Sequence, residues 1–153
     1  MKELIRKLVE TNGPSGYESA VREAVRAEIT GLVDEIKTDA LGNLIARKGT
    51  KTPAGLRVMV SGHMDEIGVI ATHIDENGFV RFTTIGGVSP RTCIGGRVQF
   101  INGTRGAIYM ESLDSATQLP TVEQLFIDVG ATNRQGCPVR WAISPLLTAH
   151  SPK

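Results

Sequence analysis

Apolar residues in the first thirty positions recur at the three- and four-residue spacing of amphipathic helices. This spacing predicts a short helix over residues 2–10 and a longer one over residues 18–30, with Ser15 near the start of the second helix as a possible cap. The stretch between them, residues 11–16, contains two glycines and a proline and therefore predicts a loop.

The spacing of apolar residues changes after residue 31 from helical to strand-like. Residues 33–38 and 43–47 are predicted to form two strands around a turn at residues 41–43. Residues 56–60 are almost entirely apolar, which is typical of a strand that is buried on both faces of a sheet. Two helices that precede a buried strand indicate the α/β class.

Helical spacing disappears from Gly68 onward, where short apolar runs alternate with turn signals. The clearest turn signals lie at residues 75–78, 86–87, 95–96 and 102–103. This pattern predicts a small β-barrel or sandwich and a domain boundary near residue 67. Since about 66 residues are few for a complete α/β domain, we expect the first part to belong to a domain that a longer protein completes after an insertion.

Composition and charge narrow the class of protein further. The chain has 153 residues, of which 41% are hydrophobic and 22% charged, as in ordinary globular domains. A net charge of +1 provides no broad basic surface, so neither nucleic acid nor a membrane is expected as a partner. No segment approaches the roughly 20 apolar residues of a bilayer span, and the first residues do not resemble a signal peptide. A cytoplasmic location is expected, in which Cys93 and Cys137 stay reduced.

One segment brings together residue types that suit metal chemistry. His63 and two acids, Asp65 and Glu66, follow directly after the predicted strand at residues 56–60. Ligand sites of open α/β sheets form at the carboxyl ends of strands, and an imidazole whose other nitrogen bonds a carboxylate is a common metal ligand. The spacing alone also fits a histidine that bonds a backbone group and an aspartate that caps a turn.

Five short motifs decide between these interpretations. They lie at residues 12–18 (NGPSGYE), 39–44 (DALGNL), 63–68 (HMDEIG), 85–91 (IGGVSPR) and 125–131 (LFIDVGA). Together they resemble the cytoplasmic metallo-aminopeptidases of metallopeptidase family 42, which include the glutamyl and deblocking aminopeptidases and form tetrahedral particles. The resemblance extends over residues 1 to about 136.

The resemblance implies an α/β catalytic domain that is interrupted by a β-barrel-like insert used for dimerisation. Residues 1–66 then form the N-terminal part of the catalytic domain, residues 67–138 an incomplete insert, and residues 139–153 an aberrant tail. His63 corresponds to a metal ligand and Asp65 to the catalytic acid that orients it, in a site for two divalent metal ions, zinc or cobalt. The implied activity is the removal of N-terminal residues from peptide substrates by a homo-oligomer that associates through the insert.

The resemblance also implies that these 153 residues hold only part of the site. In the family, a bridging aspartate, a Glu-Glu pair, a further aspartate and a second histidine come from the catalytic half that follows the insert. The other acidic and histidine residues noted in this chain show no pattern that directs them to the candidate site; they are His73, Glu111, Asp114, Glu123, Asp128 and His150. We therefore expect weak metal binding, no turnover by this chain alone, and uncovered strand edges that favour association.

Two other functions stay open at this point. The first is a non-catalytic fragment that only self-associates through its β segment. The second is a glycoside hydrolase, because some relatives carry a glucanase label, although no carboxylate pair of that kind stands out. The glycine-rich stretch at residues 86–91 is interpreted as a tight turn with Arg91 in solvent.

The resemblance stops between Gly136 and Arg140, and the codons that can encode the following residues suggest a reason. Trp141 is encoded only by TGG and Ala142 by GCN, so the frame that starts at the last base of codon 141 reads GGC, glycine, and then NAT, which is aspartate if N is G. Relatives have a Gly-Asp-containing strand at this place. We therefore expect residues from about 139 onward to be a frameshifted translation that packs irregularly. The encoding DNA tests this, since its displaced frame must continue into an Asp-containing metal-ligand segment and a Glu-Glu pair.

Overall fold

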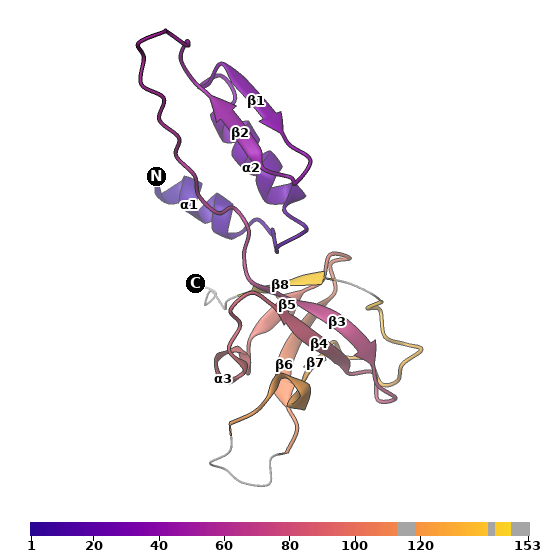
Figure 1. Cartoon of the computed structure of the whole chain (residues 1–153). Coiled ribbons are helices and arrows are strands. Elements are labelled where there is room, and N and C mark those ends of the chain that lie inside the picture. Colours follow the sequence, from indigo (N-terminus) through magenta and orange to yellow (C-terminus); the bar gives the residue numbers. More distant parts are fainter. Residues whose placement is uncertain (113–118, 141–142, 148–153) are drawn as a thin grey trace. The chain divides into compact units, whose positions relative to one another are not determined.

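The computed structural model describes residues 1–112 and 119–140, together with the backbone of residues 143–147 (Figure 1). The chain divides into two compact units, of which the first is Met1–Asp65 and the second begins at Glu66. The division lies close to the point where the spacing of apolar residues changes from helical to strand-like.

The first unit contains both predicted helices and the first two predicted strands. Helix α1 spans Lys2–Val9 and α2 spans Ser19–Ile29, and they are followed by β1 (Glu35–Thr38) and β2 (Leu44–Arg47). The two strands pair antiparallel over their whole length. Asp39 closes the turn between them, because its carboxylate accepts the backbone N–H groups of Leu41 and Asn43.

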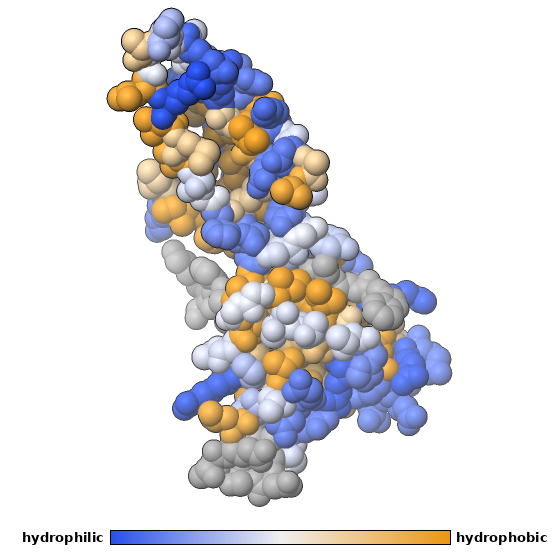
Figure 2. Space-filling model, viewed as in Figure 1, coloured by the Kyte–Doolittle hydropathy of each residue, from blue (hydrophilic) through white to orange (hydrophobic). Residues whose placement is uncertain are grey.

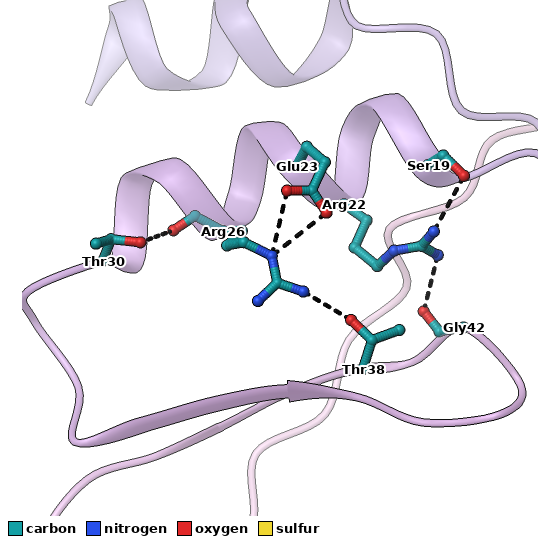
Figure 3. A network of polar contacts seen from close by, with 7 residues as sticks. All are labelled: Ser19, Arg22, Glu23, Arg26, Thr30, Thr38 and Gly42. Atoms are coloured by element: carbon teal, nitrogen blue, oxygen red, sulfur yellow. Dashed lines mark hydrogen bonds and ion pairs between the residues drawn. The ribbon is translucent and has the colours of Figure 1, made fainter.

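Polar contacts hold α2 against the strand pair (Figure 3). The Arg26 guanidinium donates to the Thr38 hydroxyl at 2.7 Å, and the Arg22 guanidinium donates to the Gly42 carbonyl at 3.1 Å. Among the described residues of this unit, the only buried apolar side chains are those of Pro14 and Val21. The first unit therefore has helices and strands but almost no hydrophobic core.

Residues 56–60, which are predicted to form a third strand, do not form one. The segment has no regular secondary structure, and the side chains of Leu56, Val58, Met59 and Val60 are between 84% and 97% exposed. The sheet of the first unit consists of β1 and β2 alone within the described part of the chain. A strand needs neighbours that exchange backbone hydrogen bonds with it. The prediction is wrong here because apolar composition indicates burial and does not supply the neighbour.

The second unit is a closed barrel of six antiparallel strands, which agrees with the turn-rich pattern of its sequence. Its elements are β3 (Gly68–Ile74), β4 (Val80–Ile85), α3 (Pro90–Cys93), β5 (Arg97–Gln99), β6 (Arg105–Met110), the 3-10 turn η1 (Val122–Gln124), β7 (Leu125–Asp128) and β8 (Ile143–Leu147). Around the barrel the order is β3-β4-β7-β6-β5-β8. The β3–β4 turn uses Gly78 at a φ of +89°, a conformation that glycine adopts without strain.

A single hydrophobic core fills the barrel. Among the residues whose side chains the structure describes, twelve buried ones belong to it: Val69, Ala71, Val80, Phe82, Cys93, Val98, Phe100, Ile108, Leu125, Ile127, Cys137 and Val139. Both cysteines are free thiols, as expected, and burial raises the pKa of Cys93. The expected α/β layer followed by a mostly β segment is confirmed. The hydrophobic core lies in the second unit, and the only buried apolar side chains that the structure describes in the first unit are those of Pro14 and Val21.

The end of the described chain departs from the expectation of an irregular tail. The backbone of residues 143–147 forms β8, which pairs with β3 and with β5, and the Val139 side chain is fully buried. The expectation of irregular packing is wrong for this backbone, because an extended segment completes the ladders of two strands by main-chain hydrogen bonds. Pro145 has no N–H group to donate, which makes it an unusual residue for a strand with two neighbours.

Within the residues that the structure describes, no helix has the length and apolar character needed to cross a bilayer.

The barrel core provides a direct test of this architecture. Among the described residues, Phe100 has the largest fully buried side chain, so Phe100→Ala should lower the free energy of unfolding by about 3–5 kcal/mol. Its neighbour Ile101 is 56% exposed, and Ile101→Ala should change the free energy of unfolding by less than about 0.5 kcal/mol. Urea unfolding followed by circular dichroism measures both, and equal effects of the two substitutions would contradict the assigned core.

Candidate metal centre

His63 and Asp65 lie together at the end of the extended apolar segment. The Nδ1 atom of His63 is 2.8 Å from Oδ1 of Asp65. The His63 side chain is 94% exposed, whereas that of Asp65 is 30% exposed. The imidazole therefore projects into solvent while the carboxylate beside it is partly enclosed.

Ser15 is the second partner of Asp65, and the sequence pattern did not predict this. Its hydroxyl donates to Oδ2 of Asp65 at 2.6 Å, across fifty positions of sequence. The predicted capping role of Ser15 is wrong, because α2 begins only at Ser19, with Glu18 at its N-cap position and no side-chain cap. The signal that could have found this contact is the NGPSGYE motif itself, which places a hydroxyl directly after a Gly-Pro pair.

Gly13 shows why this loop can reach the candidate site. A Cβ atom at this position would collide with the side chain of Val21 on α2, and the carbonyl oxygen of Met64 would lie 3.7 Å away. Glycine therefore lets the loop backbone pass directly against α2 and close to the segment that contains His63 and Asp65. The loop position fixes Ser15 opposite Asp65.

The two hydrogen bonds act on the pKa of Asp65. The Ser15 hydroxyl first, and then the His63 ring, hold the pKa of Asp65 below its usual value. Asp65 is therefore a carboxylate at neutral pH and can only accept hydrogen bonds. The proton of the shared bond must then lie on Nδ1 of His63. In the neutral ring, Nε2 keeps its lone pair and is the atom that can bind a metal.

The described residues fit one metal ligand with its orienting acid and do not fit a whole metal site. Within residues 1–112 and 119–140, no group of three or more His, Cys, Asp or Glu side chains is placed to hold a metal ion. His73 is exposed on β3, as expected for a residue near a hairpin turn, and Glu111 pairs with Arg81 at 2.6 Å. Asp114 and His150 lie outside the described residues.

The remaining candidates belong to the barrel unit. Glu123 lies in η1 and Asp128 ends β7. Arg91 is exposed in α3, which agrees with its interpretation as a solvated residue after a glycine turn. Of the candidate residues, the structure thus brings together His63 and Asp65 and adds Ser15.

An α/β layer that carries a histidine–carboxylate pair and continues into a closed antiparallel barrel is the class of fold that the five motifs imply. The model of the M42 glutamyl aminopeptidase family matches residues 42–139. The chain belongs to this family, which confirms the resemblance found in the motifs.

Individual relatives agree with this assignment. A protein of Acetivibrio thermocellus, named "Putative aminopeptidase", is 47% identical over 135 residues, which cover 88% of this chain and 40% of the relative. The aminopeptidase APDkam598 of the archaeon Desulfurococcus kamchatkensis, a solved structure, is 36% identical with a TM-score of 0.82, and the match covers 95% of this chain and 42% of that one. The TET1 peptidase of Pyrococcus horikoshii is 31% identical with a TM-score of 0.85, covering 98% and 47%.

The matched region is less than half of each of these relatives. This chain spans 40% of the Acetivibrio thermocellus relative and less than half of either solved chain. More than half of each relative therefore has no counterpart in these 153 residues.

The tautomer of His63 is a direct prediction of this geometry. In the neutral ring the proton should reside on Nδ1, and Asp65→Ala should move it to Nε2 because the carboxylate acceptor is lost. Long-range proton–nitrogen NMR correlations measure the tautomer, and exposed His73 in the same spectra is the internal control. A wild-type His63 that carries its neutral-state proton on Nε2 would contradict the assigned hydrogen bond.

Proposed function

We propose that this chain is the part of a metal-dependent aminopeptidase that supplies one metal-binding histidine and its orienting groups. The reaction is the hydrolytic removal of N-terminal residues from peptide substrates. The observation that carries the proposal is the chain of contacts from Ser15 through Asp65 to His63 in a member of the M42 glutamyl aminopeptidase family. An exposed imidazole held in one tautomer by a fixed carboxylate has the form of a metal ligand.

Each of the three residues has a distinct role in this proposal. His63 holds one of two divalent ions, zinc or cobalt, through Nε2. Asp65 keeps the imidazole in the metal-binding tautomer, and the hydroxyl of Ser15 holds the Asp65 carboxylate in place. When bound, the ions polarise the scissile carbonyl and lower the pKa of a water molecule.

The remaining ligands and the general base belong, in this proposal, to the part of the relatives that this chain does not span. One imidazole and an orienting carboxylate do not saturate an ion that prefers four to six ligands. We therefore expect the 153 residues alone to bind zinc weakly and to show no turnover. Submicromolar, stoichiometric zinc binding that His63→Ala abolishes would show that the chain holds further ligands.

Assembly is the second part of the proposal. The Pyrococcus horikoshii TET1 peptidase is described as able to assemble into a tetrahedron or a large octahedral shell. We infer a homo-oligomer for this chain as well, with the barrel unit as the associating part, and a cytoplasmic location. A non-catalytic, self-associating fragment is the competing function, and it predicts association without any hydrolysis in the completed protein.

Activity measurements separate these functions. This chain, joined to the stretch of the Acetivibrio thermocellus relative that follows the matched residues, should hydrolyse amino-acid anilides in the presence of cobalt or zinc. His63→Ala and Asp65→Ala should each lower kcat/KM by about tenfold to a hundredfold. His73→Ala, in the barrel, should leave kcat/KM unchanged.

Three results of these assays would contradict the proposed function. A folded, metal-loaded fusion protein that cleaves no anilide would favour the non-catalytic function, and cleavage of a glucan by the same protein would favour the glycoside hydrolase. Full activity in the His63→Ala variant would show that another residue binds the metal.

A further inference from the structure

The barrel unit contains a cavity that the proposed function does not use. Its volume is about 380 Å³, which lies within the range of small-molecule sites. Both segments of chain that line it belong to the second unit. The lining residues are Ala71, Thr72, His73, Ile74, Arg134 and Arg140.

The end of β3 forms one wall of the cavity, and the strand loses its regular pairing there. Between Ala71 and His73 the register with β4 shifts, so Thr72 has no partner residue in that strand. On the other edge, the described pairing with β8 covers Gly68–Ile70 and extends no further. A β-bulge of this kind re-aims the side chains around it and is frequent beside functional sites. The irregular strand end therefore leaves room for a ligand.

The segment between β7 and β8 supplies the two positive charges of the cavity. Arg134 and Arg140 both lie in this segment, and Figure 1 shows it beside the end of β3. Figure 2 shows hydrophilic residues gathered on this side of the barrel. Both arginines are exposed, so a ligand from solvent can reach them.

No described carboxylate neutralises these charges. Among the ion pairs of the described residues, none includes Arg134 or Arg140. The acid that follows β3, Asp75, is already engaged, because its carboxylate accepts the backbone N–H of Phe79 and pairs with Arg81 at 3.4 Å. A guanidinium stays protonated in proteins, and a cleft lined by charges of one sign concentrates ions of the other sign. The cavity is therefore suited to an anion.

We propose that this cavity binds a small organic phosphate, in the form of a phosphate monoester. Guanidinium groups match phosphate oxygens with paired N–H donors. Two of them balance the about two negative charges of a phosphate monoester at neutral pH, whereas a carboxylate carries one. The Thr72 hydroxyl is a further donor, and the apolar residues Ala71 and Ile74 line the same cavity and give the organic part a surface to contact.

This site goes beyond the proposed function and does not rest on it. None of the residues of the candidate metal centre, Ser15, His63 and Asp65, lines the cavity. Binding of a phosphate monoester can therefore be measured on the 153-residue chain without any peptidase activity.

Calorimetric titration with three probes tests the chemical class of the ligand. Phenyl phosphate offers a dianion with an apolar group, inorganic phosphate offers the phosphate alone, and benzoate offers the apolar group with a single charge. Phenyl phosphate should bind at least about tenfold more tightly than either of the others, because it alone uses both the guanidinium pair and the apolar wall. Benzoate that binds as tightly as phenyl phosphate would overturn the proposal, and so would a chain that does not bind phenyl phosphate.

Arginine variants test the position of the site. Arg134→Gln and Arg140→Gln should each weaken phenyl phosphate binding by about tenfold or more, because hydrogen bonds between charged groups are lost. Arg105→Gln is the matched control, since it removes the same charge from β6 outside the cavity, and it should leave the affinity unchanged. All three arginines are exposed, and circular dichroism verifies that the fold is kept. Unchanged affinity in either cavity variant, or an equal loss in Arg105→Gln, contradicts the assigned site.

His73 provides a readout that needs no altered fold. Its ring lines the cavity and serves as a reporter, because the charge balance does not require it. In a chelator-treated, metal-free sample of the wild-type chain, phenyl phosphate should shift the imidazole NMR resonances of His73, which His73→Gln identifies. The resonances of His63, in the first unit, should stay in place. Binding that leaves His73 unmoved would place the ligand elsewhere and overturn the proposal.

Discussion

The pairing of strand edges is the constraint on which the rest of this structure depends. Backbone N–H and C=O groups must find partners wherever side chains are to be buried, and the two units meet this requirement to different degrees. In the second unit, β8 closes the ring between β3 and β5, so every strand has two neighbours and a hydrophobic core can form inside. In the first unit, β1 and β2 pair only with each other, and the apolar segment that follows them stays exposed.

The candidate metal centre depends on the first unit in spite of its thin core. Gly13 lets the loop before α2 pass against Val21, and this position brings Ser15 to Asp65. Asp65 then fixes the proton on the imidazole of His63. Because these contacts are polar and lie within the first unit, the orientation of the histidine does not depend on a hydrophobic core. In the proposed function, the part of the relatives that this chain does not span supplies the remaining ligands.

Periodicity predicts the single elements and the structural class of each part of the chain. Both helices and the β1–β2 pair follow from spacing and turn signals, and the barrel follows from repeated short apolar runs with glycine turns. Spacing could not show that residues 56–60 lack neighbours, because pairing depends on other segments. For the same reason the contact between Ser15 and Asp65, and the pairing of residues 143–147 with two strands, lie beyond what the sequence pattern indicates.

Hydrogen exchange of the 153-residue chain alone tests the central claim that its barrel is complete and its α/β layer is not. Backbone amides of paired barrel residues such as Val69 and Ile127 should be strongly protected, since both lie in the closed barrel and have fully buried side chains. Amides of residues 57–60 should exchange near the rate of an unstructured chain. Protection of residues 57–60 equal to that of the barrel would contradict this account, because it would mean that the apolar segment already has neighbours.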